Sequence, residues 1–259
     1  MNSIKFSILI TSYNKKKYIE ECIDSCLSQN HNNYEIILID NYSDDGSEKI
    51  FKQYSDKIKI LQKKKISKYA PVNQIDLLIN SFKLSSGSII SFLDGDDYFF
   101  KEKLFEIEKI FLSQKNIDVV FDIPIIKDKT KLTRFVNKKK FQKNIWPTII
   151  PTSSICMRRS FFDYCLNKGL FNDFFNLEVD FRINVLCRNI KNNYFISQKK
   201  LTVYRKVENG IMSNINKYEK KWWQKRLEAH NFMKILYLNN KDVYKNKLDY
   251  YLTKFLSKI

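Results

Sequence analysis

Three aspartates lie close together at Asp94-Gly-Asp-Asp97, directly after the apolar run Ser88–Leu93. Carboxylates at this spacing repel one another unless a cation or positively charged side chains compensate their charge. Mg²⁺ and Mn²⁺ prefer oxygen ligands, and they commonly take one or two protein carboxylates together with substrate phosphates. The cluster therefore predicts a divalent-metal site for phosphate chemistry. The alternative is a solvated acidic turn with an aspartate at a helix N-terminus.

Two other polar clusters follow apolar runs in the same way. Thr11–Asn14 comes at the end of the run Phe6–Thr11, and Asp40–Asp45 comes after Tyr34–Ile39. Continuous apolar runs of this kind are typical of strands that are buried on both faces of a parallel sheet. Ligands of such sheets bind beyond the carboxyl ends of the strands. We therefore expect the three clusters to meet at a single edge of the sheet.

The elements that position these clusters alternate between strand and helix. Apolar residues at helical spacing predict a helix from Tyr18 to Leu27, and Asp45-Gly-Ser-Glu48 has the pattern of a capping box that opens the next helix. This alternation predicts a parallel sheet with right-handed crossovers. The basic stretch 127–143 is expected to be a surface loop or hairpin. The other expected strands are 58–61, 88–93, 119–126, 154–157 and 194–204, and the other helices are 71–84, 101–113, 177–187, one from 160 and two within 217–259.

Composition limits the classes of protein that fit. Apolar residues make up 44% and aromatic residues 15% of the 259, which excludes a mainly disordered chain. With only 5 glycines, the sequence contains neither the GxGxxG nor the GxxxxGK[ST] nucleotide-binding motif. The 5 cysteines are interpreted as reduced core residues of a cytoplasmic protein, and the 2 histidines, His31 and His230, are expected at the surface. Neither a signal peptide nor a membrane span is predicted.

The formal net charge of +18 is the other strong feature of the composition. Such an excess favours polyanionic partners, whether nucleic acid, an anionic membrane surface or phosphorylated substrates. It also arises without a function in a genome poor in G and C, where lysine, asparagine and isoleucine are abundant together. The basic residues cluster in segments 57–68, 127–143 and 217–259.

Three segments of the sequence resemble one known family. They are Ser-Ile-Leu-Ile-Thr-Ser-Tyr-Asn (7–14), Tyr-Glu-Ile-Ile-Leu-Ile-Asp-Asn-Tyr-Ser-Asp-Asp-Gly-Ser (34–47) and Gly-Ser-Ile-Ile-Ser-Phe-Leu-Asp-Gly-Asp-Asp (87–97). In this order and spacing they are similar to the family-two inverting glycosyltransferases with the GT-A fold. The similarity is strong over 5–112, weaker over 150–213 and absent from the C-terminal segment.

This resemblance implies an α/β fold of the GT-A type, with a Rossmann-like, mostly parallel sheet flanked by helices and a C-terminal helical extension. It divides the chain into a catalytic domain over 1–215 and the extension over 216–259. The catalytic domain then consists of a nucleotide-sugar-binding half, 1–97, and an acceptor-binding half, 98–215.

The resemblance also implies roles for residues that match the family's motifs. Asp40 matches the carboxylate that recognises the base, with a strand-end cap as the alternative, and Asp94 matches the residue that faces the ribose. Asp96 matches the ligand of a Mn²⁺ or Mg²⁺ cofactor, with Asp97 in support. The full set expected to bind the nucleotide sugar is Thr11, Tyr13, Asn14, Asp40, Asp94, Gly95, Asp96 and Arg205.

An inverting transferase needs a carboxylate that accepts the proton of the attacking acceptor hydroxyl. The family carries an acidic pair at the start of a helix in its second half, and residues 175–183 occupy that place here. We predict Glu178 as this base, with Asp180 as its rival. On a helix, residues two apart point about 200° away from each other, so only one of them is expected to face the site. The alternative is a solvent-exposed helix start, which acidic residues favour because of the helix dipole.

Two departures from the family's pattern affect the phosphate contacts. Val207 stands where the family often has a histidine, and the family's usual Arg-Asn pair is absent around Leu78–Asn80. We expect Arg205, Lys206 or the lysines of segment 57–68 to neutralise the diphosphate instead. A catalytically inactive relative stays open as an alternative.

The resulting prediction is a glycosyltransferase that moves a sugar from a nucleotide-diphosphate sugar, with a UDP-sugar favoured, to a saccharide or lipid-linked acceptor in surface-polysaccharide synthesis. No nucleic acid partner is expected. Trp222-Trp223 and the basic last helix favour a peripheral contact with an anionic membrane surface, on its inner face, and an ordinary packed helix or a dimer surface are the alternatives. The oligomeric state stays open.

Two rival functions follow from other features. A nucleotidyltransferase uses nucleotide chemistry on a similar sheet, but it needs a glycine- and arginine-rich loop after the first strand, and Thr11–Lys17 has no glycine. A basic nucleic-acid-binding protein accounts for the charge of +18 and leaves the aspartates unexplained. Salt-sensitive binding to DNA or RNA, indifferent to Mn²⁺ and nucleotide sugars, would favour the latter.

Overall fold

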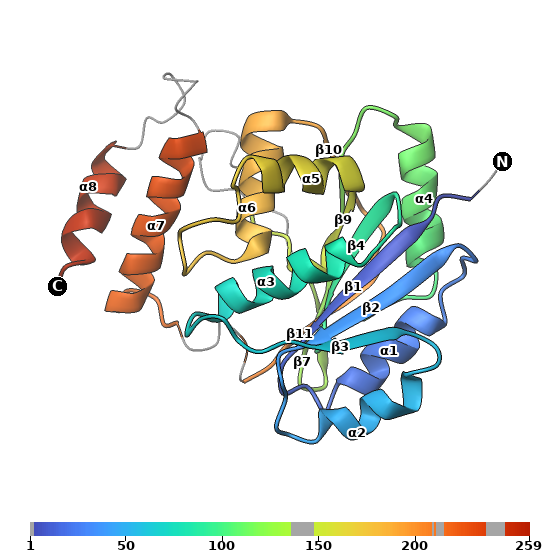
Figure 1. Ribbon diagram of the computed structural model, residues 1–259. Helices are drawn as coiled ribbons and strands as arrows, with labels where there is room; N and C mark the ends of the chain where they lie inside the picture. The colour runs from blue at the N-terminus through green and yellow to red at the C-terminus, as the bar shows by residue number, and fades with distance from the viewer. Residues whose placement is uncertain (1–2, 136–147, 209, 211–214, 237–246) are drawn as a thin grey trace.

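A seven-stranded sheet forms the centre of the computed structural model, which describes residues 3–135, 148–208, 210, 215–236 and 247–259 (Figure 1). The strand order is β10-β6-β9-β4-β1-β2-β3. Strands β3, β2, β1 and β4 run parallel, β10 runs parallel to β6, and β9 is antiparallel to both of its neighbours. The bounds are β1 Phe6–Ser12, β2 Tyr34–Asp40, β3 Lys59–Gln62, β4 Ile89–Asp94, β6 Val119–Asp122, β9 Ile155–Arg158 and β10 Tyr194–Ser197. The mostly parallel sheet predicted from the sequence is confirmed.

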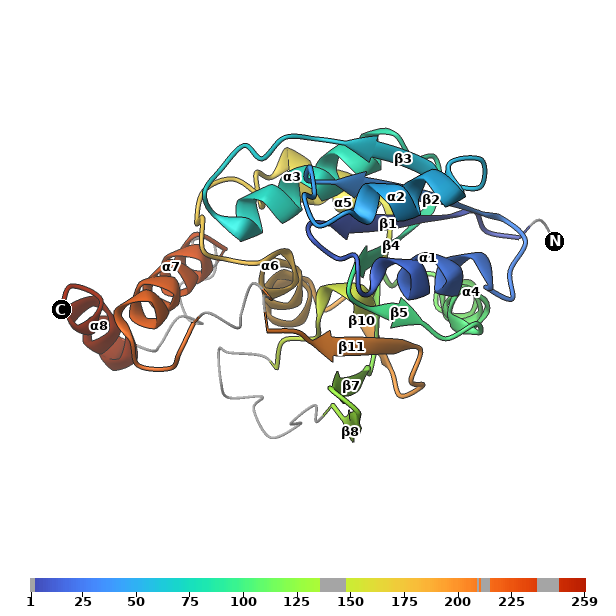
Figure 2. The ribbon, with the colours of Figure 1, turned by 90° about the horizontal axis from the view of Figure 1, so that it is seen from below.

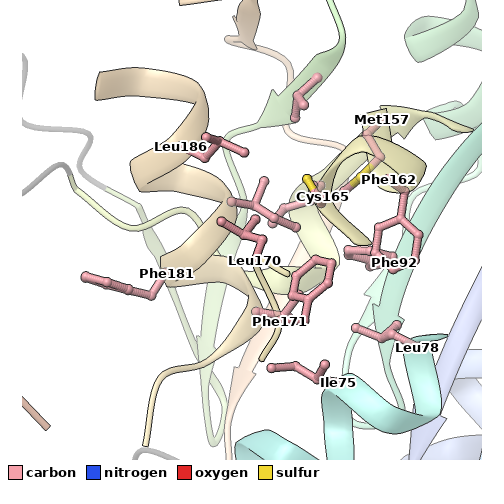
Figure 3. Packing of buried hydrophobic residues seen from close by; sticks show 14 of the residues in the cluster. Ile75, Leu78, Phe92, Met157, Phe162, Cys165, Leu170, Phe171, Phe181 and Leu186 are labelled. Carbon is pink, nitrogen blue, oxygen red and sulfur yellow. The ribbon is translucent and has the colours of Figure 1, made fainter. Parts of the chain in front are cut away.

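Helices cover both faces of this sheet (Figures 1 and 2). One face carries α1 (Ile19–Leu27), α2 (Ser47–Phe51) and α4 (Lys103–Ser113), and the other carries α3 (Ala70–Lys83), α5 (Arg159–Asn167) and α6 (Val179–Val185). Side chains alternate along each strand, so Ile8 and Leu9 enter different cores. Figure 3 shows part of the core under α3, α5 and α6, where Phe92, Phe162 and Phe171 pack together.

The register of the parallel strands brings the three polar clusters to one edge. Thr11 pairs with Asp94 across β1 and β4, and Ser12 pairs with Asp40 across β1 and β2. The residues that follow these strands therefore leave the sheet side by side at its carboxyl edge. This confirms the convergence expected from the apolar runs.

A second, four-stranded sheet, drawn below the first in Figure 2, has the strand order β5-β11-β7-β8. Its strands are β5 (Tyr98–Phe99), β7 (Ile125–Asp128), β8 (Lys131–Arg134) and β11 (Thr202–Lys206). The single strand expected over 119–126 was wrong: β6 and β7 belong to different sheets, because Pro124 between them has no N–H for a ladder hydrogen bond. The expected hairpin is present as β7 and β8, and residues 136–147 of that stretch lie outside the described residues.

The start of α2 also differs from expectation. Its N-cap is Gly46, which has a left-handed φ of 87°, rather than Asp45. The Asp45 carboxylate instead accepts hydrogen bonds from the backbone N–H and the hydroxyl of Ser47, at 3.0 and 2.5 Å. Aspartate forms this kind of short turn readily, and glycine tolerates the left-handed residue.

A buried ion pair ties the two sheets together. The ammonium of Lys103 on α4 lies 2.8 Å from the carboxylate of Asp122 on β6, and both side chains are fully buried. The same ammonium donates to the backbone oxygen of Ser153 at 2.7 Å and to the hydroxyl of Thr202 on β11 at 2.6 Å. Because all three ammonium protons have acceptors, the cost of burying the charge is largely offset.

The C-terminal segment forms α7 (Lys220–Leu236) and α8 (Lys247–Leu256), as two helices were expected there. Ala229, Phe232 and Met233 of α7 belong to the same core as α3, α5 and α6, and α8 lies on the far side of α7 from the sheet (Figures 1 and 2). Residues 237–246 of the expected helical segment lie outside the described residues. None of the described helices has both the length and the apolar character that crossing a membrane requires.

Candidate active site

A pocket of about 800 Å³ opens at the carboxyl edge of β1 and β4. It receives side chains from the ends of both strands, from α3, from the start of α6 and from β11. The sequence-predicted site residues that line it are Thr11, Tyr13, Asp94, Gly95, Asp96, Glu178, Asp180 and Arg205. The aspartate cluster of 94–97 and the acidic pair, which are far apart in the sequence, thus share one cavity.

The three aspartates of 94–97 have different environments. Asp94 accepts hydrogen bonds from the Thr11 hydroxyl at 3.0 Å and the Gln74 amide at 2.6 Å. Burial, followed by the charge of Asp96, raises the pKa of Asp94 to about 6. Asp97 is fully buried and accepts from the Ser153 hydroxyl at 2.6 Å and the Arg205 backbone N–H at 2.7 Å. Asp97 therefore supports the turn.

The carboxylate of Asp96 is the one best placed to hold a divalent cation. It forms an ion pair with the ammonium of Lys15, and its side chain is 12% exposed to the pocket. In the part of the chain that the structure describes, no group of three or more His, Cys, Asp or Glu side chains converges on a metal position. One carboxylate together with ligand phosphates is a normal set for Mg²⁺. Asp96 therefore fits an ion that binds jointly with a phosphorylated ligand.

The side chain of Arg205 stabilises the turn that carries the three aspartates. Its guanidinium donates to the backbone oxygen of Asp96 at 2.6 Å, pairs with the carboxylate of Glu21 and lies 4.6 Å from the ring centroid of Tyr98. These contacts use the guanidinium within the protein, although Arg205 lines the pocket. The other cations on the pocket wall are Lys15, Lys65, Lys68 and Lys206, which include two lysines of segment 57–68.

Asn14 and Asp40 lie outside the pocket lining. Asn14 pairs through its side chain with Asp44, donating at 2.7 Å and accepting from the Asp44 N–H at 3.0 Å. The buried carboxylate of Asp40 accepts from the backbone N–H and the hydroxyl of Ser43, at 2.7 and 2.6 Å. These contacts match the strand-end cap that was the alternative for Asp40, and the next residue, Asn41, lines the pocket.

Glu178 and Asp180 both face the pocket, contrary to the expectation that only one would. The reason is that Glu178 is the N-cap of α6, with an extended backbone (φ −68°, ψ 159°), so helical spacing does not apply to the pair. Lys225 of α7 forms an ion pair with Glu178. Burial, followed by the charge of Glu178, raises the pKa of Asp180 to about 7.

The loop before Glu178 is held by one buried arginine. The guanidinium of Arg182, which is fully buried, donates to five backbone oxygens at 2.8–3.2 Å, those of Leu170, Asn172, Asp173, Phe174 and Leu177. Asp173 and Phe174 have left-handed φ values of 51° and 53°, a conformation that non-glycine residues adopt only when it is held. Glu228 of α7 also accepts from the Asn176 N–H at 2.8 Å and its amide at 2.5 Å.

Sequence reasoning missed several residues of the site. Lys15 lines the pocket and directly follows the first polar cluster, Thr11–Asn14, so its place in the sequence could have predicted it. Gln74 enters from α3, where the family's Arg-Asn pair was sought later in the same helix, and its buried side-chain oxygen has no hydrogen-bond partner among the described residues. Leu78, at the sought position, is buried in the core instead. Lys225 is separated from Glu178 by 47 residues, and no local signal links them.

The fold is that of the GT-A glycosyltransferases. The structure is similar to that of S. aureus TarS in complex with UDP-GlcNAc, with a TM-score of 0.66 and 16% identity over 98% of this chain and 70% of that one. It is also similar to the mannosyltransferase PcManGT from Pyrobaculum calidifontis in complex with GDP-Man and Mn²⁺, with a TM-score of 0.60 and 11% identity over 99% of this chain and 74% of that one.

The chain belongs to glycosyl transferase family 2, whose sequence model matches residues 7–165. A putative teichuronic acid biosynthesis glycosyltransferase of Bacillus subtilis, TuaG, is 26% identical over 88% of this chain and 90% of its own length. An uncharacterized glycosyltransferase of Rickettsia conorii is 35% identical over 61% of this chain. The matched part spans only about a quarter of the length of that protein and of two further Rickettsia relatives.

Proposed function

We propose that this glycosyltransferase moves a sugar from a UDP-sugar to a hydroxyl of a saccharide or lipid-linked acceptor during the synthesis of a surface polysaccharide. The observation that carries the proposal is the shared pocket, which is lined by Asp96 and also by Glu178 and Asp180. In this proposal, residues 1–97 bind the donor and 98–215 bind the acceptor.

The comparisons support the donor and acceptor classes. Solved structures of S. aureus TarS contain UDP and UDP-GlcNAc, although that similarity concerns the fold alone. The Escherichia coli relative WfaP, 34% identical over 46% of this chain and 48% of its own length, is a UDP-Glc:alpha-D-GlcNAc-diphosphoundecaprenol beta-1,3-glucosyltransferase. TuaG, which this chain matches over 90% of its length, is named for the synthesis of a polysaccharide, teichuronic acid. A UDP-sugar donor and a lipid-linked acceptor are therefore the first substrates to test.

Residues of the proposed donor half can stabilise the negative charge of the leaving group. A nucleoside diphosphate gains negative charge as it departs, and a divalent cation held by Asp96 would supply Lewis-acid stabilisation of that charge. Lys15, Lys65 and Lys68 line the same wall and add positive charge from the protein itself. Tyr13 lies beside Lys65, whose ammonium is 3.2 Å from its ring centroid, and offers a flat face to a base.

The acceptor half offers two carboxylates for proton transfer. In an inverting displacement, one of them takes the proton of the attacking hydroxyl from the side opposite the leaving group. We assign this role to Glu178, because its carboxylate lines the pocket and is held there by the ion pair with Lys225. Asp180, whose raised pKa of about 7 favours the protonated form below neutrality, then serves as a hydrogen-bond donor to the acceptor.

The substitution Glu178→Gln tests this assignment. It removes the proton acceptor and keeps the shape of the side chain, so sugar transfer should fall by about 10²–10⁴-fold while the affinity for UDP stays within about twofold. Transfer is measured as UDP release in the presence of acceptor, and UDP binding by calorimetry. If Glu178→Gln keeps full activity and Asp180→Asn loses it, the base is Asp180.

A thermal-shift panel of nucleotide sugars, with and without Mn²⁺, tests the function itself. A bound donor stabilises the folded protein by mass action, so the UDP-sugar that serves as donor should raise the melting temperature most when Mn²⁺ is present. UMP and a GDP-sugar serve as controls for the diphosphate and the base. A panel in which no nucleotide sugar stabilises the protein would contradict the proposal.

A further inference from the structure

Helix α8 turns an apolar stripe toward solvent. Its members are between 51% and 84% exposed, and they are Leu248, Tyr251, Leu252, Phe255 and Ile259, the last just beyond the helix. The four members within the helix follow one another at i, i+3, i+4 and i+7, which places them on a single face at about 100° per residue. Large apolar side chains are normally buried in the core, and a contiguous exposed group of them marks an interaction site.

The opposite face of α8 is the one that packs against the protein. Thr253 and Ser257 are buried, and Asp249 lies 2.5 Å from the guanidinium of Arg226 and 3.2 Å from the ring of His230, both on α7. Figures 1 and 2 both show α8 beyond α7, at the outer end of the molecule. The polar face of the helix is therefore fixed inward by ion pairing, and the apolar stripe cannot turn inward without breaking these contacts.

Exposed lysines flank the stripe. Lys254 and Lys258 lie on its edge, next to Tyr251 around the helix. Lys220 and Lys221 are exposed at the start of α7, and the ammonium of Lys220 reaches the backbone oxygen of Lys258 at 3.5 Å, which joins the two groups of lysines. Asp249, the acidic residue of α8, is paired on the inner face.

We propose that the stripe docks on an anionic lipid bilayer, with its apolar side chains at the boundary of the acyl chains and its lysines at the headgroups. Apolar residues beside lysines match such a surface both in polarity and in charge. A second copy of this chain fits less well, because two molecules of charge +18 would bring their lysines together. The proposal rests on the proposed function, since a lipid-linked acceptor would be presented at this surface.

The position of α7 gives the docking a consequence for the site. Helix α7 holds α8 through Arg226 and His230. The same helix contacts the start of α6 through Lys225 and the loop before α6 through Glu228. A membrane bound at α8 would therefore lie next to the acceptor half of the molecule.

Flotation with lipid vesicles tests the proposal without any substrate. Wild-type protein should bind vesicles that contain phosphatidylglycerol and should bind pure phosphatidylcholine at least about tenfold more weakly, because the lysines contribute only on an anionic surface. The double variant Leu252→Glu/Phe255→Glu should lose at least about tenfold in binding to the anionic vesicles. Leu112→Glu, a change at an exposed leucine of α4, is the matched control and should bind like wild type.

A second variant and a second measurement separate the outcomes. Lys254→Gln/Lys258→Gln should weaken anionic binding by at least about tenfold and reduce its salt dependence. Unchanged binding in either double variant, or no binding by wild type, would overturn the proposal. A wild-type dimer that Leu252→Glu/Phe255→Glu converts to monomer in light scattering would also overturn it, because the stripe would then lie between two copies. UDP binding is measured on the same samples, so failure of membrane docking and failure of the proposed function can be told apart.

Discussion

Single residues decide how charge is distributed in the pocket. Asp96 pairs with Lys15, whereas its neighbours Asp94 and Asp97 accept hydrogen bonds mainly from neutral groups of the protein. The cluster therefore has one carboxylate whose partner is a cation, and that carboxylate is the candidate for a metal ligand. Lys225 likewise pairs with Glu178, whereas Asp180 has no ion pair of its own among the described contacts.

Asp180→Asn is expected to stabilise the protein more at pH 8 than at pH 5. The carboxyl has a pKa of about 7 in the folded protein and about 4 in the unfolded chain, so between these values the folded state holds more protons. The wild-type free energy of unfolding therefore falls as the pH rises from about 4 to 7, and an asparagine removes this loss. Melting temperatures measured by circular dichroism should show a variant advantage of several degrees at pH 8 that shrinks toward pH 5. An advantage that does not change with pH would contradict the burial argument.

Elements far apart in the sequence meet around Glu178 and Asp180. The start of α6 supplies both carboxylates because Glu178 lies just before the first helical turn. Arg182, one turn later, fixes the loop that precedes it through backbone oxygens, and α7 clamps the same loop with Glu228 and Lys225. The predicted boundary at 215 places α7 outside the predicted catalytic domain, although α7 packs into the core of that domain and contacts the loop before α6.

Lys225→Met tests whether α7 contributes to the chemistry. Loss of the ammonium leaves the part-buried Glu178 carboxylate without its Lys225 partner, so the transfer rate at pH 7 should fall by at least about tenfold, while UDP binds as before. Lys221→Met, at an exposed position of the same helix, serves as the control and should keep the wild-type rate. An unchanged rate in Lys225→Met would show that the ion pair is structural only.

The elements of the sheet could be predicted because strands buried on both faces leave continuous apolar runs, and topology then places their ends. Contacts between distant elements could not be predicted in this way. His31 and His230 were expected at the surface, and both are buried, at 3.4 Å from Glu108 and 3.2 Å from Asp249. The spacing of the acidic pair was interpreted as helical, whereas the cap residue is extended. The sequence also could not predict which face of α8 packs against the protein, because ion pairs with α7 determine that face rather than hydropathy.

The whole molecule combines the pocket at the sheet edge with an outer pair of helices, α7 and α8, on one GT-A fold. Parallel strands bring Thr11 and Asp94 together, and the buried pair of Lys103 and Asp122 fixes the second sheet beneath them. Arg205 on that second sheet then supports the turn that carries Asp96. The pocket is thus a product of the entire fold, and its binding properties report on the whole arrangement.

The most direct test of this arrangement is calorimetric titration of UDP into the protein with and without Mn²⁺. We predict that Mn²⁺ tightens UDP binding and that Asp96→Asn lowers the affinity in Mn²⁺ by at least about tenfold, because Asp96 is the carboxylate that would share the cation with the diphosphate. Asp56→Asn, an exposed aspartate away from the pocket lining, should bind like wild type. Wild-type affinity in Asp96→Asn, or UDP binding that Mn²⁺ leaves unchanged, would contradict the account.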